Sequence, residues 1–364
     1  MIYRLILAIR NARYAKGRRS VKAPVPTICV GNVTVGGTGK TPHTELLLRL
    51  LGQTSRWGGS NLAVLSRGYG RRSRGFQQVT TDGTAAFCGD EPLQIKRNFP
   101  SVTVAVDKDR VRGCRILCNP ALALEAKGRK KCVSPDFPPA DIILLDDAFQ
   151  YRKLSATLNI VLTSYHRPVT EDTLLPFGRL RDLPSRLYDA DIIIVSKCPG
   201  GLDDEDKAEF ATRLGLENYD PSACTATRKG RTLKLLFSTI AYKRGMPVFE
   251  SADSRYLYSG KLILFTGIAD DTPLYDQLSG SYAIVGRLRF PDHHEFRLSD
   301  LGKIEALMKK HPTALVATTE KDARRLEALG GMSQELKTRL FYIPIEAEFL
   351  TDVEKECLLQ SLPQ

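Results

Sequence analysis

The stretch from Val25 to Leu51 constrains the fold of this chain more than any other. It begins with Thr27-Ile28-Cys29-Val30, a β-branched, apolar segment that predicts a buried strand. A glycine-rich turn follows, and the run from Glu45 to Leu51 is rich in helix-forming residues. A strand, a glycine-rich turn and a helix in this order are typical of the P-loop, which binds phosphate groups.

The turn supplies the side chains that a P-loop needs. Lys40 is expected to contact the β- and γ-phosphates of a nucleoside triphosphate, and the Thr41 hydroxyl is expected to ligate Mg²⁺. The usual motif has glycine six positions before the lysine, where this chain has Thr34, so we expect Gly31, Gly36 and Gly37 to provide the conformational freedom. A simple connecting turn also fits the glycines, but Gly-Lys-Thr between a strand and a helix favours nucleotide binding. The expected nucleotide-binding residues are Thr34, Val35, Gly36, Gly37, Thr38, Gly39, Lys40 and Thr41.

A second functional motif is the acid pair Asp146-Asp147, which follows a predicted strand. The apolar run Ile142-Ile143-Leu144-Leu145 predicts a buried strand that delivers these two acids to its carboxyl end. In P-loop proteins a carboxylate at this place holds Mg²⁺, directly or through water. Two adjacent acids could also begin a turn, but the P-loop upstream favours the metal role.

Two other stretches of the sequence combine arginines with features of a ligand site. The strand Leu62–Leu65 leads into a loop with four arginines, including Arg67 and Arg71, at the edge of the sheet where parallel α/β folds bind ligands. A solvated loop is the alternative. The stretch from Leu174 to Asp182 mixes apolar residues with Arg179 and Arg181, which suits either a substrate with phosphate and acyl chains or a loop between domains.

Two segments carry candidates for acid–base chemistry. Asp90 lies in Gly89-Asp90-Glu91-Pro92 at the start of a predicted helix, where an acid is also a common N-cap. Asp292-His293 follows Pro291 on a predicted loop; the histidine could be a base, a metal ligand or a phosphate contact, or simply a surface residue.

Repeated strands separated by helical stretches predict an α/β fold with a P-loop NTPase-like, doubly wound, mostly parallel sheet and a second, smaller α/β domain. We expect three parts: a basic amphipathic segment at residues 1–24, a kinase-like core at 25–225 and a smaller C-terminal α/β domain at 226–364. The last is expected to contain strands near residues 233–237, 261–265, 282–285 and 314–317.

The net charge of +12 is concentrated near the N-terminus, because seven cations precede Pro24 and the first acid is Glu45. The apolar run Met1–Ile9 is too short to span a bilayer and does not resemble a signal peptide. A helix on an anionic membrane surface and a helix packed on the domain both fit, whereas nucleic acid ranks last because no nucleic-acid module is recognisable. Eight cysteines without a C-x-x-C pair predict no zinc site and a reducing, cytosolic compartment.

Taken together, the motifs resemble the tetraacyldisaccharide 4'-kinase family of lipid A biosynthesis, over most of the chain. Thr34 in the first P-loop position is itself typical of that family. The motifs that carry the resemblance are Gly31 to Pro42, Ser66-Arg67-Gly68-Tyr69-Gly70-Arg71, Gly89-Asp90-Glu91-Pro92, Asp146-Asp147-Ala148-Phe149-Gln150, Leu175-Pro176-Phe177-Gly178 to Asp182, Asp292-His293 and Thr319-Glu320-Lys321-Asp322-Ala323.

The resemblance implies transfer of the ATP γ-phosphate to the 4'-hydroxyl of a tetraacylated glucosamine disaccharide 1-phosphate. It implies that Asp90 is the base, assisted by His293 with Asp292 beside it, and that closure of the second domain assembles this pair. The residues that bind Mg²⁺ would be Thr41, Asp146, Asp147 and Asp182. Family members usually have glutamate at the position of Asp182. Arg67, Arg71 and Arg181 would contact substrate phosphate or lipid. The expected protein is a monomer, bound peripherally to the cytoplasmic face of the inner membrane.

Two other classes of protein share some of these features. A regulatory or switch ATPase with a P-loop is the main alternative. A GTPase would need an N-K-x-D motif, and Ser196-Lys197-Cys198-Pro199 lacks both the Asn and the Asp. A membrane-surface binding protein with a vestigial nucleotide site is disfavoured by the intact Lys40, Thr41 and Asp146.

Overall fold

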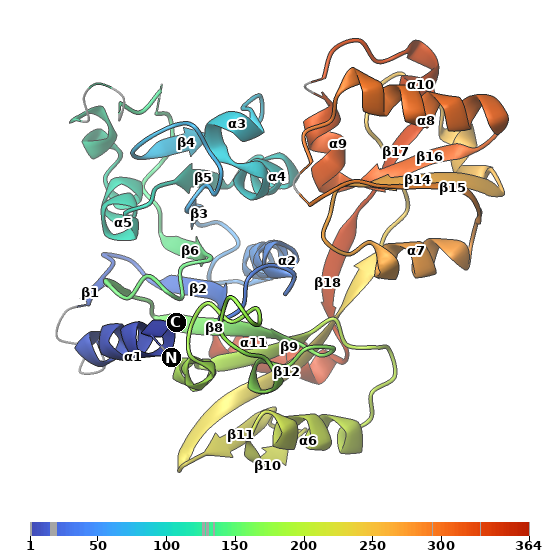
Figure 1. The fold of residues 1–364 in the computed structure, drawn as a ribbon. Coiled ribbons are helices and arrows are strands. Elements are labelled where there is room, and N and C mark those ends of the chain that lie inside the picture. Colours follow the sequence, from blue (N-terminus) through green and yellow to red (C-terminus); the bar gives the residue numbers. More distant parts are fainter. Residues whose placement is uncertain are drawn as a thin grey trace. The chain divides into compact units, whose positions relative to one another are not determined.

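The computed structural model describes residues 2–14, 20–125, 128, 131–133, 135–292, 294–327 and 329–363. The chain divides into two compact units (Figure 1). Unit 1 comprises residues 1–240 and 347–364, and unit 2 comprises residues 241–346.

Unit 1 is built on a sheet with the strand order β10-β11-β12-β9-β8-β2-β6-β3-β5-β4, and β18 pairs with β12. All neighbours from β12 to β5 are parallel, whereas β4, β10 and β11 run antiparallel to their partners. Parallel strands bring their carboxyl ends to one edge, which is where the P-loop, Arg67 and the acid pair Asp146-Asp147 lie. The strands are β2 (Thr27–Asn32), β3 (Leu62–Ser66), β4 (Gln77–Val79), β5 (Thr103–Val106), β6 (Ile142–Asp146), β8 (Leu158–Ser164), β9 (Ile192–Ser196), β10 (Glu217–Asp220), β11 (Thr225–Arg228), β12 (Arg231–Tyr242) and β18 (Ile345–Phe349).

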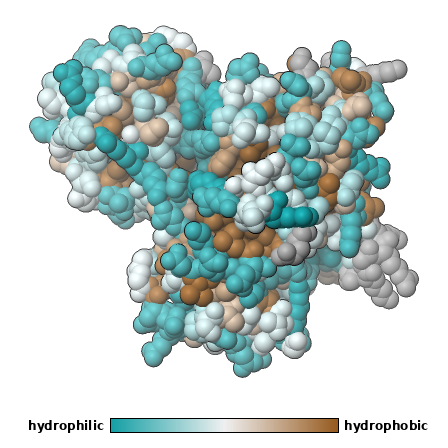
Figure 2. All heavy atoms as spheres, turned by 180° about the vertical axis from the view of Figure 1, so that it is seen from behind, coloured by the Kyte–Doolittle hydropathy of each residue, from teal (hydrophilic) through white to brown (hydrophobic). Residues whose placement is uncertain are grey.

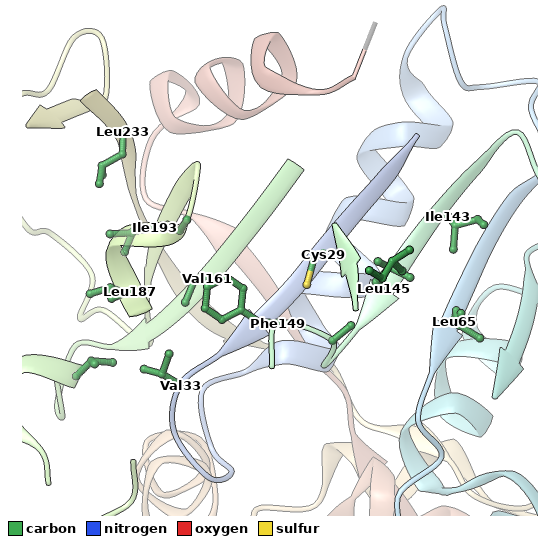
Figure 3. Close-up of a cluster of buried hydrophobic side chains, with 14 of the residues drawn as sticks. Cys29, Val33, Leu65, Ile143, Leu145, Phe149, Val161, Leu187, Ile193 and Leu233 are labelled. Atoms are coloured by element: carbon green, nitrogen blue, oxygen red, sulfur yellow. The ribbon is translucent and has the colours of Figure 1, made fainter. Parts of the chain in front are cut away.

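Helices cover this sheet on both faces (Figure 1). Within β2, Ile28 and Val30 belong to one buried apolar cluster and Cys29 belongs to another, because side chains alternate along a strand. Figure 3 shows the second cluster, in which side chains from neighbouring strands line up with Cys29 and Phe149. The helices are α1 (Ile2–Tyr14), α2 (Lys40–Gln53), α3 (Ala85–Cys88), α4 (Asp90–Asn98), α5 (Arg110–Cys118), α6 (Asp204–Arg213) and α11 (Asp352–Ser361). The short strand β1 (Val21–Lys22) follows α1 and pairs in parallel with β7 (Leu154–Ser155).

Unit 2 has its own sheet with the order β13-β17-β16-β14-β15, in which only the pairing of β13 with β17 is antiparallel among the described strands. Two apolar clusters lie on its faces, one including Ile263 and Phe265 and the other Leu262 and Leu264. The elements are β13 (Met246–Pro247), β14 (Lys261–Thr266), α7 (Thr272–Ser279), β15 (Ala283–Arg289), α8 (Leu298–Lys310), β16 (Leu315–Thr319), α9 (Glu320–Glu327), α10 (Gln334–Arg339) and β17 (Leu340–Ile343).

The predicted fold class is confirmed: an α/β protein with a P-loop NTPase-like, doubly wound, mostly parallel sheet and a second, smaller α/β unit. The division between the units differs from the expected boundary at 225/226, since it falls after Ile240 and the chain returns to unit 1 at Ala347. The segment 233–237, expected in the second domain, lies in β12 and pairs with β9 and β11 of the first sheet.

The face of the molecule drawn in Figure 2 is mostly polar. Figure 2 shows hydrophilic residues over most of the visible face, with hydrophobic residues gathered in smaller patches. Among the residues that the structure describes, none of the helices combines the length and hydrophobicity needed to cross a bilayer.

Candidate active site

The loop between β2 and α2, residues 33–39, is here called the phosphate loop. Gly36, Gly37 and Gly39 have φ angles of 65°, 71° and 76°, which other residues adopt only with strain. At Gly36 and Gly37 no described atom lies within 4 Å of the place where a Cβ would stand. Without side chains the backbone N–H groups are open to an approaching anion, next to the N-terminus of α2. The freedom predicted for these two glycines is confirmed.

Gly31 serves a different purpose from the one predicted. It lies inside β2 and makes no turn. A Cβ on Gly31 would stand 2.5 Å from the Cβ of Phe149, so glycine is required there for close approach of two backbone segments.

Side chains hold the phosphate loop from both ends. The Asn32 amide donates to the Thr38 hydroxyl at 2.7 Å, and Ser196 at the end of β9 donates to the Thr38 carbonyl at 2.9 Å. The carbonyl of Asn32 accepts a hydrogen bond from Gln150. The loop is thus fixed to the carboxyl ends of its neighbouring strands.

His43, in the first turn of α2, secures the start of that helix. Its Nδ1 lies 2.7 Å from the Gly39 carbonyl and its Nε2 lies 2.8 Å from the Ser238 hydroxyl. Burial lowers the pKa of His43 to about 4, so the ring is neutral at physiological pH. A neutral ring that donates from Nδ1 to Gly39 accepts from Ser238 through Nε2.

Lys40 lies among charges at the mouth of the phosphate loop. Its Nζ is 3.9 Å from Asp147 Oδ1, and burial lowers its pKa although Asp147 partly offsets this. The Asp147 carboxylate is also held by two hydrogen bonds from the Arg181 guanidinium, one of 3.0 Å to Oδ2 and one to Oδ1. Burial alone would raise the pKa of Asp147, but Lys40 and Arg181 bring it below its usual value, so Asp147 stays ionised.

Asp146 has a contrasting environment at the end of β6. Its side chain is buried and accepts from Ser66 at 2.9 Å. Burial, together with the negative charges of Asp147 and Glu91, raises the pKa of Asp146 to about 6. A buried carboxylate that lacks sufficient positive charge nearby suits the binding of a cation.

The donor set fits a nucleotide-bound Mg²⁺ rather than a protein-only metal site. No group of three or more His, Cys, Asp or Glu side chains that could hold a metal occurs among the described residues. Mg²⁺ bound with nucleotides needs only one or two protein ligands, because phosphate and water fill the rest of its shell. Thr41, one residue after Lys40, and Asp146 could supply these, whereas Asp147 is already occupied by Lys40 and Arg181.

Asp90 is the first residue of α4, and the N-cap is Gly89, not Asp90. Gly89 has φ 99°, and a Cβ there would stand 3.2 Å from the Gly68 Cα and from the Tyr69 carbonyl. The arginine loop, residues 67–75, therefore lies against the turn that precedes Asp90.

The helices α2 and α4 lie side by side. Glu45 of α2 accepts hydrogen bonds from Gln94 at 3.1 Å and Asn98 at 3.2 Å, both in α4. At the start of α4, Glu91 is near enough to act on the pKa of both Lys40 and Asp146. The first turn of α4, which carries Asp90, is thus next to the charged mouth of the phosphate loop.

The predicted substrate arginines divide into different roles. Arg67 is exposed at the end of β3 and is available to a ligand. Arg71 instead donates to the carbonyls of Gly75 at 2.6 Å and Val106 at 3.2 Å, so it holds the arginine loop together. Arg181 is engaged with Asp147 and, at 2.6 Å, with the Asn32 side chain.

The structure gives Asp182 partners other than the metal predicted for it. Its carboxylate is completely buried and accepts from Arg10 at 2.8 Å and Asn11 at 2.9 Å, both in α1. The backbone N–H of Leu183 also donates to it at 2.9 Å. These contacts account for both oxygens, so the family resemblance does not by itself assign Asp182 to Mg²⁺ here.

In unit 2, His293 lies outside the described residues, and the neighbouring Asp292 is exposed. The next residue, His294, is anchored: its Nε2 is 2.9 Å from Asp300 and its ring stacks on Phe290 at 4.8 Å. Asp322 accepts from the Gly267 backbone at 2.8 Å and from the Thr319 hydroxyl at 2.7 Å.

A Cβ on Gly267 would be 3.2 Å from the Cβ of His294 and 3.0 Å from Asp322. The Thr319–Ala323 motif therefore holds Gly267, which lies against His294. This gives a structural reason for a motif whose role the sequence left open.

Sequence reasoning gives no role in this site to several residues, among them Asn32, Ser66, Glu91 and Arg110. Asn32 and Ser66 are the last residues of their strands, and that position was a usable signal. Glu91 follows Asp90 in the same motif, in which only Asp90 has a predicted role in catalysis. Arg110, buried at the start of α5, donates to the Asp147 carbonyl at 3.4 Å, a contact that no local pattern indicates.

Comparison with known proteins agrees with this geometry. The family described as tetraacyldisaccharide-1-P 4'-kinase matches residues 1–363. A tetraacyldisaccharide 4'-kinase of Phocaeicola vulgatus is 37% identical over 361 residues, covering 97% of this chain and 90% of the relative. That of Bacteroides thetaiotaomicron is 39% identical over 363 residues, covering 96% and 87%.

Among solved structures, the chain is similar to LpxK from Aquifex aeolicus, a crystal structure described as an "apo" form in complex with ATP. The TM-score is 0.67 at 25% identity, covering 99% of this chain and 95% of the other. With the family match and the relatives, this similarity shows that the chain belongs to the tetraacyldisaccharide 4'-kinase family and is an ATP-dependent phosphotransferase with an alcohol group as acceptor.

Proposed function

We propose that this protein transfers the γ-phosphate of ATP to the 4'-hydroxyl of a tetraacyl glucosamine disaccharide 1-phosphate in lipid A biosynthesis. One observation carries the proposal: the open phosphate loop, Lys40 and the acid pair Asp146-Asp147 meet at one sheet edge, beside the helix that begins with Asp90. The family membership supplies the identity of the acceptor. The ATP of the Aquifex aeolicus structure supports the identity of the donor.

Asp90 is the proposed base. Its carboxylate accepts the proton of the 4'-hydroxyl while the new O–P bond forms and the bond between the γ-phosphorus and the bridging oxygen breaks, so that ADP leaves. Phosphoryl transfer has a loose transition state, so a base is needed late and positioning contributes most. Assistance from His293, with Asp292 beside it, stays a prediction.

Charge at the transferred phosphate is balanced by Lys40 and by backbone N–H groups of the phosphate loop. Mg²⁺, held by Thr41 and Asp146, would neutralise charge on the β- and γ-phosphates. The Arg181 guanidinium keeps Asp147 ionised beside Lys40, which fixes the ammonium group at the mouth of the loop.

The exposed side chains of α1 support a lipid surface as partner. Leu5, Ile6 and Ile9 are 62%, 56% and 49% exposed, and Phe177 in the Leu174–Asp182 stretch is 94% exposed. Apolar groups of this size on a surface with many cations favour peripheral binding to an anionic membrane, here the cytoplasmic face of the inner membrane.

The experiment incubates γ-labelled ATP with the disaccharide 1-phosphate lipid and follows label in the lipid. The wild type should label the lipid, and Asp90→Asn should reduce turnover by about a hundredfold or more with ATP affinity retained, since general-base catalysis contributes roughly 10²–10⁴-fold. Lys40→Ala should lose both turnover and ATP affinity. ATP hydrolysis without lipid labelling would indicate the regulatory ATPase class instead, and full turnover by Asp90→Asn would remove that residue from the mechanism.

A further inference from the structure

The segment Arg179–Asp182 contacts three parts of unit 1 that are far apart in the sequence. On one side it pairs with the phosphate loop: Val35 N–H donates to the Arg179 carbonyl at 2.8 Å, and Arg181 N–H donates to the Val33 carbonyl at 2.9 Å. Between these bonds Leu180 is fully buried and bridges Thr34. The first half of the phosphate loop therefore has this segment as its only antiparallel partner among the described residues.

The Arg181 side chain extends this contact to the acid pair. It holds both carboxylate oxygens of Asp147 and donates to the Asn32 side chain at 2.6 Å. Asn32 in turn donates to Thr38 in the second half of the phosphate loop. A displacement of Arg181 would thus affect the loop at both halves and the carboxylate beside Lys40.

On its other side the same segment holds α1. The Tyr3 hydroxyl donates to the Arg181 carbonyl at 3.1 Å, and Asp182 accepts from Arg10 and Asn11. Along α1, the residues Tyr3, Leu7, Arg10, Asn11 and Tyr14 recur at helical spacing and form one stripe. Leu7 in this stripe is only 2% exposed, while the apolar Leu5, Ile6 and Ile9 lie outside it and face away.

The docking of α1 on this segment depends on the side chain of Asp182, which is buried from water when α1 is in place. With α1 docked, Asp182 is completely buried, and its side chain is satisfied by the hydrogen bonds from Arg10 and Asn11. Arg186 lies 3.8 Å away as a second, more distant cation. Undocking α1 would remove the Arg10 and Asn11 contacts and open the carboxylate to water, so the segment that carries Asp182 would lose the contacts that fix it on this side.

We propose that Asp182 is a positioning residue that couples the seating of α1 to the conformation of the phosphate loop. Nucleotide affinity is then higher when α1 is docked. Coupling of two binding events is reciprocal, so a bound nucleotide stabilises the docking of α1 by the same factor. A helix whose outer face suits lipid thereby becomes linked to the ATP site. The inference rests on the proposed function only in taking ATP as the nucleotide.

The test measures the dissociation constant of a fluorescent ATP analogue without lipid, for wild type, Arg10→Gln and Asp182→Asn. We expect about tenfold weaker binding in both variants, within the usual range for allosteric coupling. Combining the two changes should add little, because both remove one contact. Arg4→Gln is the matched control: it removes the same charge from an exposed residue of the same helix that makes no hydrogen bond or ion pair with Asp182 in the described part of the chain, and it should leave the affinity unchanged.

Two further measurements separate positioning from a general loss of stability. The charge-reversed pair Arg10→Asp with Asp182→Arg should recover part of the affinity that each single change loses. Saturating ATP should increase protection of the α1 amides from hydrogen exchange in the wild type and not in Arg10→Gln.

Equal ATP affinity in wild type, Arg10→Gln and Asp182→Asn would overturn the inference and leave the proposed kinase activity standing. A melting temperature lowered in the variants without any change in affinity would overturn it as well. A wild type that does not bind ATP would contradict the proposed function itself.

Discussion

The fold opposes the protonation of His43. Its pKa of about 4 is well below the ordinary value of 6.5, because burial disfavours the charged ring. Below pH 6.5 the unfolded chain binds a proton that the folded chain refuses, so the free energy of unfolding falls as the pH drops towards 4. Below that the folded state is protonated too and the loss is complete. The shift corresponds to about 3 kcal/mol.

We expect His43→Gln to remove this acid sensitivity. Urea unfolding at a series of pH values between 7 and 4 should show the wild type losing about 3 kcal/mol more than the variant. His166→Gln, at an exposed site, controls for the removal of a histidine. Parallel pH profiles for wild type and His43→Gln would contradict the assignment.

For single residues, the sequence predicts which side chains meet when a motif fixes their spacing. Lys40, Asp146 and Asp147 were identified because a P-loop and an acid-ended strand place them together in any sheet of this kind. The partners of Asp182 could not be found in this way, since Arg10 lies 172 residues away and only the folded chain brings the two together. His293 and the metal roles stay predictions.

Two glycines, Gly31 in β2 and Gly52 in the following helix α2, have very different amounts of space around them. Replacing each by alanine tests how much that space contributes to stability. At Gly31 in β2 a methyl group would collide with the Cβ of Phe149, whereas at Gly52 in α2 no described atom lies within 4 Å. Gly31→Ala should lower the free energy of unfolding by about 1–3 kcal/mol, the usual cost of overpacking. Gly52→Ala should raise it by about 0.5–1 kcal/mol, because alanine favours helix.

Thermal or urea unfolding of both variants beside the wild type measures these changes. The two substitutions add the same atoms, so a loss of stability at Gly31 beside a gain at Gly52 would show that the added methyl group has no room in β2. A stable Gly31→Ala variant would mean that β2 and the turn at Phe149 can separate at little cost.

Apolar elements were predictable and polar ones were not. The strands at 27–30, 62–65, 142–145, 158–162 and 192–195 appear within β2, β3, β6, β8 and β9, because short apolar runs buried on both faces have a clear pattern. The edge strand β10 reads Glu-Asn-Tyr-Asp and is mostly exposed, so it has neither hydrophobic alternation nor an apolar run. Its pairing with β11 comes from the hairpin rather than from side-chain burial.

At the scale of the whole molecule, unit 2 is an insertion into unit 1. The chain leaves through β12 and returns through β18, which pairs with β12, and Leu350 N–H donates to the Phe237 carbonyl at 3.1 Å. The returning segment is integral to unit 1: Leu358 is fully buried, and Lys207 forms a buried ion pair with Glu354 at 2.7 Å. A linear division of the sequence could not foresee this return, because no composition change marks Ala347.

An insertion of this kind can be removed, and doing so tests the role of unit 2. Replacing residues 241–346 by a short Gly-Ser linker should leave a folded chain that binds ATP with near wild-type affinity, because the phosphate loop, Lys40 and Asp146 all lie in unit 1. Lipid phosphorylation should fall by about a hundredfold or more, the usual contribution of a lost acid–base group, if His293 assists Asp90. Truncation after Glu346 is the contrasting variant: it removes α11 with the buried Leu358 and the ion pair of Glu354 with Lys207, so we expect it to destabilise unit 1. Wild-type turnover in the excised chain would show that unit 2 takes no part in the reaction.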